Sequence, residues 1–146
     1  MKTILFVCIH NSARSQMAEA FLNTAGAGQF CAESAGLEAG TLNPNVVRVM
    51  QEAGIDISSN QSKDVSGLLQ AGKQYAAVVT VCDAASAEKC PVFPGQTKRI
   101  AWSFPDPSRF TGTADEILEQ TRRVRDEIRD KVAAFVEEAG QERYWL

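Results

Sequence analysis

The feature that most constrains the fold lies within residues 4–25, where a strand-like run leads through a polar loop into a helix. The run at residues 4–7 is entirely apolar, as in a buried strand, and apolar residues recur at helical spacing from Met17 onward. The loop between them begins at Cys8 and includes Arg14. Such a loop directs backbone N–H groups at one point beside a helix N-terminus, where the helix dipole favours an anion. We therefore predict an oxyanion-binding loop.

Cys8 and Arg14 are the reactive members of this predicted loop. Backbone N–H groups at a helix N-terminus stabilise a thiolate, which is the nucleophilic form of cysteine. The Arg14 guanidinium offers two parallel donors to a tetrahedral anion. A small buried cysteine beside a surface arginine is the alternative interpretation, but the flanking strand and helix favour a site. The predicted loop residues are Ile9, His10, Asn11, Ser12, Ala13, Arg14 and Ser15.

Strand and helix patterns alternate along the rest of the chain. Further strands are predicted at residues 30–34, 76–81 and 99–102. Further helices are predicted from Asn43-Pro44, near 65–69, and from a capping box at Thr113 and Glu116 to Gly140. We therefore predict an α/β fold in a single domain over residues 1–146, with a doubly wound parallel sheet of about four strands and helices on both faces.

Composition and charge exclude several classes of function. The net charge is −3 and no long basic run is present, so we predict no nucleic-acid partner. The apolar run near the N-terminus is shorter than the ~20 residues that span a membrane, and no cleavage site of a signal peptide follows it. We expect a cytoplasmic protein with no membrane partner.

The four cysteines point to chemistry rather than to permanent cross-links. Disulfides are rare in a reducing compartment, so catalysis, metal binding or redox cycling has to explain Cys8, Cys82 and Cys90. Zinc does not fit, because there is no Cys-x2-Cys pair and the one histidine, His10, lies in the anion loop. We predict no metal and no cofactor, and we interpret Cys31 as an ordinary strand residue.

Three reactive side chains are expected at one edge of the predicted sheet. The first strand ends at Cys8, the strand at 76–81 ends at Cys82, and the last strand leads toward Asp106. Parallel sheets bind ligands at the carboxyl ends of their strands. Asp106, flanked by two prolines, is the candidate general acid, and an aspartate that only begins a turn is the alternative.

The loop resembles the Cys-x5-Arg-Ser signature of the low-molecular-weight phosphotyrosine phosphatase fold. Within that fold, the run Asn-Ser-x-Arg-Ser-Gln-Met-Ala-Glu is similar to the thioredoxin-coupled arsenate reductases. Further matching segments are Ser34–Gly36, Asn43-Pro44, Val78–Cys82, Cys90-Pro91, Trp102, Asp106-Pro107 and Val124–Ile128. The resemblance covers nearly the whole chain and implies a phosphatase-like fold with Asp106 as the acid.

The resemblance implies an enzyme of arsenical resistance that reduces arsenate to arsenite, with phosphate or sulfate as competing anions. Two thiols supply the two electrons by forming a disulfide. In the implied relay, Cys82 attacks the arsenic adduct of Cys8, and Cys90 then attacks Cys82. Thioredoxin or a similar dithiol reduces the resulting Cys82–Cys90 disulfide. The residues between these two cysteines are small and polar, as a rearrangement between thiols requires.

The chain departs from the family pattern at informative positions. Ala13 stands where the family often has a cysteine, and the segment from Cys82 to Cys90 is one residue longer than in well-known members. Asn11 and Ser34 match positions that support the loop and that bind potassium in some members. Lys63 occupies another of those positions, where its ammonium group could replace the cation.

Two other functions stay open on the sequence. A phosphotyrosine phosphatase would share the first chemical step, but its usual Asp-Pro-Tyr motif is replaced here by Asp106-Pro107-Ser108. A non-catalytic redox or anion sensor would use the same cysteines without turnover.

Overall fold

The computed structural model describes residues 1–82, 88–91 and 93–146. It contains a sheet of four parallel strands in the order β2-β1-β3-β4. The strands are β1 (Lys2–Cys8), β2 (Phe30–Gly36), β3 (Ala77–Thr80) and β4 (Lys98–Ala101). The predicted single-domain α/β fold with a parallel four-stranded sheet is confirmed, and β4 begins one residue earlier than predicted.

The helices follow the predicted pattern, and their ends show why. Asn43 accepts a hydrogen bond from the backbone N–H of Asn45 and so caps the helix that starts at Pro44. Thr113 and Glu116 form the predicted capping box. The helices are α1 (Arg14–Ala25), α2 (Pro44–Glu52), α3 (Val65–Gln70), α5 (Ala114–Ala139) and the 3-10 turns η1 (Pro107–Arg109) and η2 (Glu142–Trp145).

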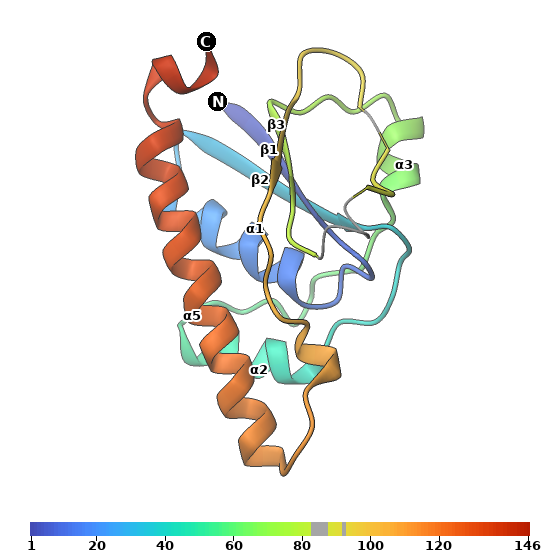
Figure 1. Cartoon of the computed structure of the whole chain (residues 1–146), viewed down its shortest axis with the longest axis vertical. Coiled ribbons are helices and arrows are strands. Elements are labelled where there is room, and N and C mark those ends of the chain that lie inside the picture. The colour runs from blue at the N-terminus through green and yellow to red at the C-terminus, as the bar shows by residue number, and fades with distance from the viewer. Residues whose placement is uncertain (83–87, 92) are drawn as a thin grey trace.

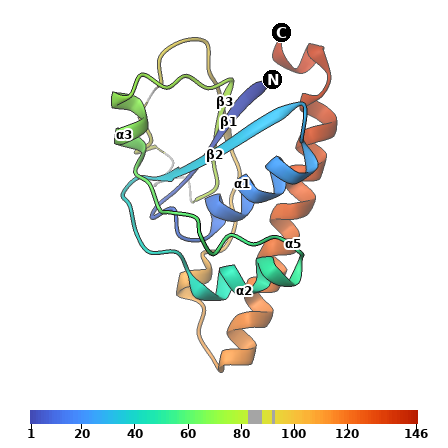
Figure 2. The ribbon, with the colours of Figure 1, turned by 180° about the vertical axis from the view of Figure 1, so that it is seen from behind.

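Helices lie on both faces of the sheet, as predicted. Figures 1 and 2 show α1 and the long α5 packed together, and α3 on the far side of the sheet from α5. Side chains alternate along β1, so Ile4 and Phe6 join the core under α1 and α5, while Leu5 and Val7 join the core on the α3 side. This alternation explains the continuous apolar run in the sequence.

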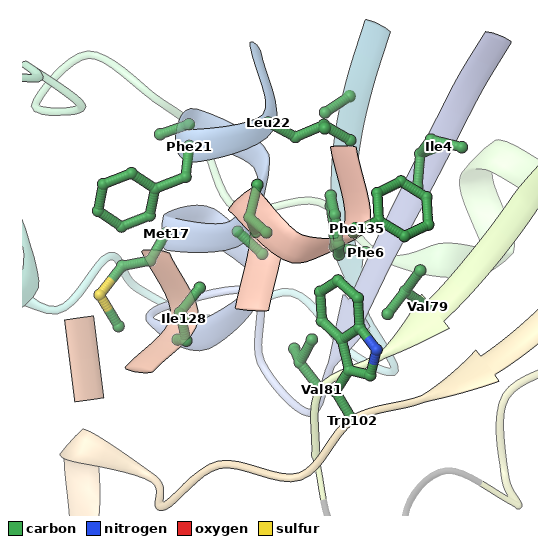
Figure 3. Close-up of a cluster of buried hydrophobic side chains, with 14 of the residues drawn as sticks. Ile4, Phe6, Met17, Phe21, Leu22, Val79, Val81, Trp102, Ile128 and Phe135 are labelled. Carbon is green, nitrogen blue, oxygen red and sulfur yellow. The ribbon is translucent and has the colours of Figure 1, made fainter. Parts of the chain in front are cut away.

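An aromatic cluster forms the centre of the larger core. Figure 3 shows Trp102 close to Phe6 and Phe135, and the ring centroids of both pairs are 5.8 Å apart. The Phe135 ring also lies 5.5 Å from the ring of Phe30. Phe135 thereby joins α5 to the strands.

The C-terminal residues fold back on the sheet. Trp145 donates its indole N–H to Ala139 O at 2.8 Å, and Lys98 Nζ donates to Tyr144 O at 3.1 Å. The two termini lie near each other in Figures 1 and 2. None of the helices among the described residues is long and apolar enough to cross a membrane.

The ends of the strands are aligned at one edge of the sheet. Val81 N–H donates to Val7 O at 2.9 Å, and Trp102 N–H donates to Thr80 O at 2.7 Å, so the pairing continues just past β3 and β4. Consequently the residues that follow β1, β3 and β4 leave the sheet at the same edge.

We expect Phe135→Ala to lower the free energy of unfolding by about 3–5 kcal/mol, because it removes a buried ring from the aromatic cluster. Urea unfolding followed by far-UV circular dichroism measures the change. The matched control is Glu137→Ala, an exposed position on the same helix, which should change the value by less than about 0.5 kcal/mol. A similar loss for both variants would contradict the importance of this ring.

Candidate active site

The candidate site is built on the connection between β1 and α1. Cys8 is the last residue of β1 and is buried, while Arg14 is the first residue of α1. Residues 9–13 form the loop between them. The predicted loop residues Arg14 and Ser15 therefore lie in the first turn of the helix, where backbone N–H groups have no partner within the helix.

A chain of hydrogen bonds ends on the Cys8 sulfur. Cys8 Sγ lies 2.8 Å from Ser15 Oγ, and Asn11 Nδ2 donates to the same Ser15 oxygen at 2.8 Å. Because the Ser15 oxygen already accepts a hydrogen bond from Asn11, its own O–H can donate to sulfur. The Ser15 hydroxyl is therefore placed as a hydrogen-bond donor to the candidate nucleophile.

Asn11 holds the shape of the loop. Its φ of 54° lies in the left-handed region, which asparagine tolerates better than most residues. The side chain is fully buried and uses its full set of hydrogen bonds: Nδ2 also donates to Ser34 Oγ at 2.9 Å, and Oδ1 accepts from Lys63 N at 3.0 Å and from Gln16 Nε2 at 3.1 Å. These contacts tie the loop to β2 and to the segment before α3.

Gln16 is a supporting residue that the sequence interpretation missed. It is fully buried, and besides Asn11 Oδ1 its Nε2 contacts Asn11 O and Gln61 O, both at 3.2 Å. Asn60 Nδ2 donates to Gln16 Oε1 at 3.1 Å. A polar amide beside Met17 in the first turn was the available signal, but two of its partners, Asn60 and Gln61, lie 44 and 45 residues away in the sequence.

Glu19 and Lys63 extend this network behind the loop. Ser34 Oγ donates to Glu19 Oε1 at 3.2 Å, and Lys63 Nζ lies 3.9 Å from the same oxygen. Burial raises the pKa of the Glu19 carboxyl, and the Lys63 ammonium and the Ser34 hydroxyl partly oppose that shift. Lys63 therefore supports the loop twice, through its backbone N–H and through its charge.

The residues after β2 pack directly against the loop. Leu37 N–H donates to Cys8 O, and Glu38 N–H donates to Ile9 O, both at 3.0 Å. Gly36 allows this approach, since a Cβ there would lie 2.7 Å from Asn11 N. The His10 side chain points to the surface, with Nδ1 3.2 Å from Glu38 Oε1.

Arg14 and Asp106 lie together at the sheet edge. The Arg14 side chain is 6% exposed, with Nη2 3.6 Å from Asp106 Oδ2 and Nη1 donating to Phe104 O at 3.2 Å. Asp106 Oδ1 accepts the backbone N–H of Ser108 at 3.0 Å and so caps η1. Asp106 thus begins a turn, and its second carboxylate oxygen is directed toward Arg14.

The other cysteines occupy three different surroundings, and the side chains of all four are thiols. Cys82 follows β3 at the aligned edge and is buried. Cys90 lies in the core on the α3 side, where burial raises the pKa of its thiol. Cys31 is a half-buried residue of β2. The predicted rearrangement of the linking residues falls largely on 83–87, which lie outside the described residues.

The described side chains offer no cluster of metal ligands. Within residues 1–82, 88–91 and 93–146, no group of three or more histidine, cysteine, aspartate or glutamate side chains could hold a metal ion.

The sequence and the fold both match known proteins. Residues 3–144 match the family model described as low molecular weight phosphotyrosine protein phosphatase. An arsenate reductase from Bacillus subtilis strain 168 is 45% identical over 138 residues, which cover 93% of this chain and 96% of that relative.

Solved structures agree with this match. An arsenate reductase from Archaeoglobus fulgidus is 35% identical and superposes with a TM-score of 0.73, covering 92% of this chain and 99% of that one. An arsenate reductase in its phosphate-binding state is 31% identical with a TM-score of 0.76, covering 94% of this chain and 98% of that one.

We expect Ser15→Ala to slow alkylation of Cys8 by iodoacetamide at pH 6 about tenfold, because the thiolate loses a hydrogen bond. The measurement uses protein in which Cys31, Cys82 and Cys90 are serine, so that only Cys8 reacts. Phosphate should slow the reaction if alkylation reports on the loop.

Ser66→Ala is the matched control, because Ser66 is an exposed serine of α3 remote from Cys8 in the sequence. Equal alkylation rates for the Ser15 and Ser66 variants would show that the Ser15 hydroxyl does not stabilise the thiolate.

Proposed function

The chain belongs to the low molecular weight phosphotyrosine protein phosphatase family, and within it we propose that the protein is an arsenate reductase that converts arsenate to arsenite. The observation that carries this proposal is the position of a second buried cysteine, Cys82, at the strand end next to the Cys8 loop. A phosphatase needs one thiol, whereas reduction of arsenate needs two. The identity to arsenate reductases over 93% of the chain supports the same activity.

In the first step the Cys8 thiolate attacks arsenic, and one oxygen leaves as water. Arg14 and the backbone N–H groups of the loop bind the remaining oxygens, where they stabilise negative charge. Asp106, whose Oδ2 lies 3.6 Å from Arg14, donates the proton to the leaving oxygen. The relative that was solved in a phosphate-binding state supports an oxyanion site in this fold.

In the second step Cys82 attacks the Cys8 sulfur. The bond between sulfur and arsenic breaks, its electron pair stays on arsenic, and arsenite leaves as the Cys8–Cys82 disulfide forms. The thiolate of Cys90 then attacks Cys82 and displaces the Cys8 thiolate, which leaves a Cys82–Cys90 disulfide. A dithiol such as thioredoxin reduces that disulfide and becomes oxidised itself.

The working conditions follow from the same residues. We propose that residues 1–146 act as one domain. We also propose that the protein works in the cytoplasm, because four thiols and a dithiol reductant suit a reducing compartment. The Lys63 ammonium beside Glu19 supplies a positive charge behind the loop, so we propose that activity requires no potassium or other metal. Phosphate and sulfate should compete with arsenate.

A phosphotyrosine phosphatase remains the second candidate, because it shares the first step. The residues after Asp106-Pro107 disfavour the phosphatase. The phosphatase motif has an aromatic residue at this point, whereas here Ser108 and Arg109 of η1 follow. Oxidation of NADPH in the presence of arsenate, thioredoxin and thioredoxin reductase distinguishes the candidates. Turnover supports the reductase, whereas hydrolysis of phosphotyrosine without arsenate reduction would indicate a phosphatase, and neither activity would indicate a sensor.

We expect Asp106→Asn to reduce the first chemical step by roughly 10²–10⁴-fold. Asparagine can still accept the Ser108 N–H, so the turn is kept while the proton donor is lost. The loss should be larger on phosphate esters with poor leaving groups than on activated esters, in steady-state assays. Asp130→Asn on the surface of α5 is the control, and equal losses on both kinds of ester would mean that Asp106 only holds the turn.

We expect removal of each cysteine to stop the reaction at a different stage. Cys8→Ser should abolish a single turnover, and Cys82→Ser should release no arsenite. Cys90→Ser should release about one arsenite per enzyme and stop as the Cys8–Cys82 disulfide. Peptide mapping after arsenate treatment identifies the trapped bridge. Cys31→Ser is the control and should cycle normally, whereas sustained turnover without Cys90 would contradict the assigned order.

A further inference from the structure

Arg99 of β4 lies directly against the backbone of Cys90. Its Nη1 and Nη2 both donate to Cys90 O, each at 3.4 Å. Arg99 pairs with Val78 in the sheet register, and Val78 belongs to the core on the α3 side, where Cys90 also lies. The strand alternation therefore aims Arg99 at Cys90.

The neighbouring residue on β4 shows the contrast. Lys98 lies on the opposite face of the strand, where its Nζ donates to Tyr144 O at 3.1 Å. Arg99 instead lines a small cavity of about 60 Å³ together with Pro91 and Phe93, and also borders a surface groove with Glu88. The guanidinium thus reaches along the described parts of the segment around Cys90.

The Cys90 thiol lies in surroundings that oppose its ionisation. It is 5% exposed and packs among apolar side chains that include Val78, Phe93 and Tyr75. Burial raises the pKa of the thiol, and the Arg99 guanidinium opposes that shift. Because a thiol attacks a disulfide as the thiolate, this burial slows the last exchange unless a positive charge compensates for it.

Among the described residues, the other ionisable groups near this core do not supply that charge. Burial and the nearby Glu33 raise the pKa of the Tyr75 hydroxyl, which donates to Glu33 Oε1 at 3.0 Å and stays neutral. The charge of Glu33 is matched by Lys73, whose Nζ lies 3.4 Å from Glu33 Oε2. Glu88 and Lys89, of opposite charge, are exposed next to Cys90 in the sequence.

We propose that Arg99 is the positioning residue of the second resolving thiol: it holds the Cys90 carbonyl and thereby keeps its positive charge beside the Cys90 sulfur. This inference rests on the relay of the proposed function. When Cys90 loses its proton to solvent, its thiolate attacks Cys82 and forms the Cys82–Cys90 bond. The Cys8–Cys82 bond breaks, Cys8 leaves as a thiolate, and no net electrons are transferred. Arg99 stabilises the charge on Cys90 before this attack.

The first test isolates Cys90 and does not depend on arsenate. In protein with Cys8, Cys31 and Cys82 replaced by serine, we measure the rate of Cys90 alkylation between pH 6 and 11. Arg99→Gln should move the midpoint upward by about one pH unit, because the charge is lost. Arg99→Lys keeps the charge and should move it less. Lys98→Gln, the matched control on the opposite face, should leave the midpoint unchanged.

An unchanged midpoint in Arg99→Gln, with only the limiting rate altered, would overturn the proposal, since a purely structural role changes access to the thiol but not its ionisation. If Arg99→Gln does not fold, Arg99→Lys serves as the second variant. An upward shift of the midpoint in Arg99→Lys as large as the one expected for Arg99→Gln would also overturn the proposal.

The second test separates this inference from the relay itself. With the four cysteines in place, Arg99→Gln should still release the first arsenite at the normal rate, and the Cys8–Cys82 disulfide should then accumulate in quenched samples. Normal cycling of Cys90→Ser would contradict the relay. If Cys90 is required but Arg99→Gln cycles like the unmodified protein, the relay stands and the role of Arg99 is wrong.

Discussion

The hydrogen bonds of the buried Asn11 side chain are the interaction on which the rest of the site depends. They hold one residue in the left-handed region and so allow the loop after β1 to turn back toward the N-terminus of α1. The same side chain leaves the Ser15 hydroxyl available to the Cys8 sulfur. The partners of Asn11 maintain the shape of the loop from behind: Gln16, Ser34 and the backbone of Lys63.

Parallel strand pairing places the reactive groups at one edge. Since the pairing of β1, β3 and β4 ends at nearly the same level, Cys8, Cys82 and the turn that carries Asp106 leave the sheet together. In open parallel sheets, ligands bind at this edge, outside the carboxyl ends of the strands. Tyrosine phosphatase and arsenate reductase chemistry share this arrangement, and additional thiols distinguish the second from the first.

The two faces of the sheet divide the cysteines. Cys8 belongs to the core under α1 and α5, and Cys90 belongs to the core on the α3 side. A relay between them has to carry the disulfide from one side of the sheet edge to the other, with Cys82 at the edge between them. Burial protects Cys90 as a neutral thiol, and Arg99 offsets part of the resulting cost of ionisation.

Local chemistry in the sequence was sufficient to predict the strand, loop and helix around Cys8 and the caps at Asn43 and Thr113, because each depends on residues close together in the chain. The parallel sheet followed from the alternation of strand and helix patterns. Convergence of Cys8 and Asp106 followed from the topology alone. The roles of Gln16, Gly36 and Arg99 depend on contacts with residues up to 45 positions away, and nothing in the local pattern specifies those distant partners. The face that buries Cys90 was likewise decided by packing, since a cysteine beyond a strand end can turn toward either side of the sheet.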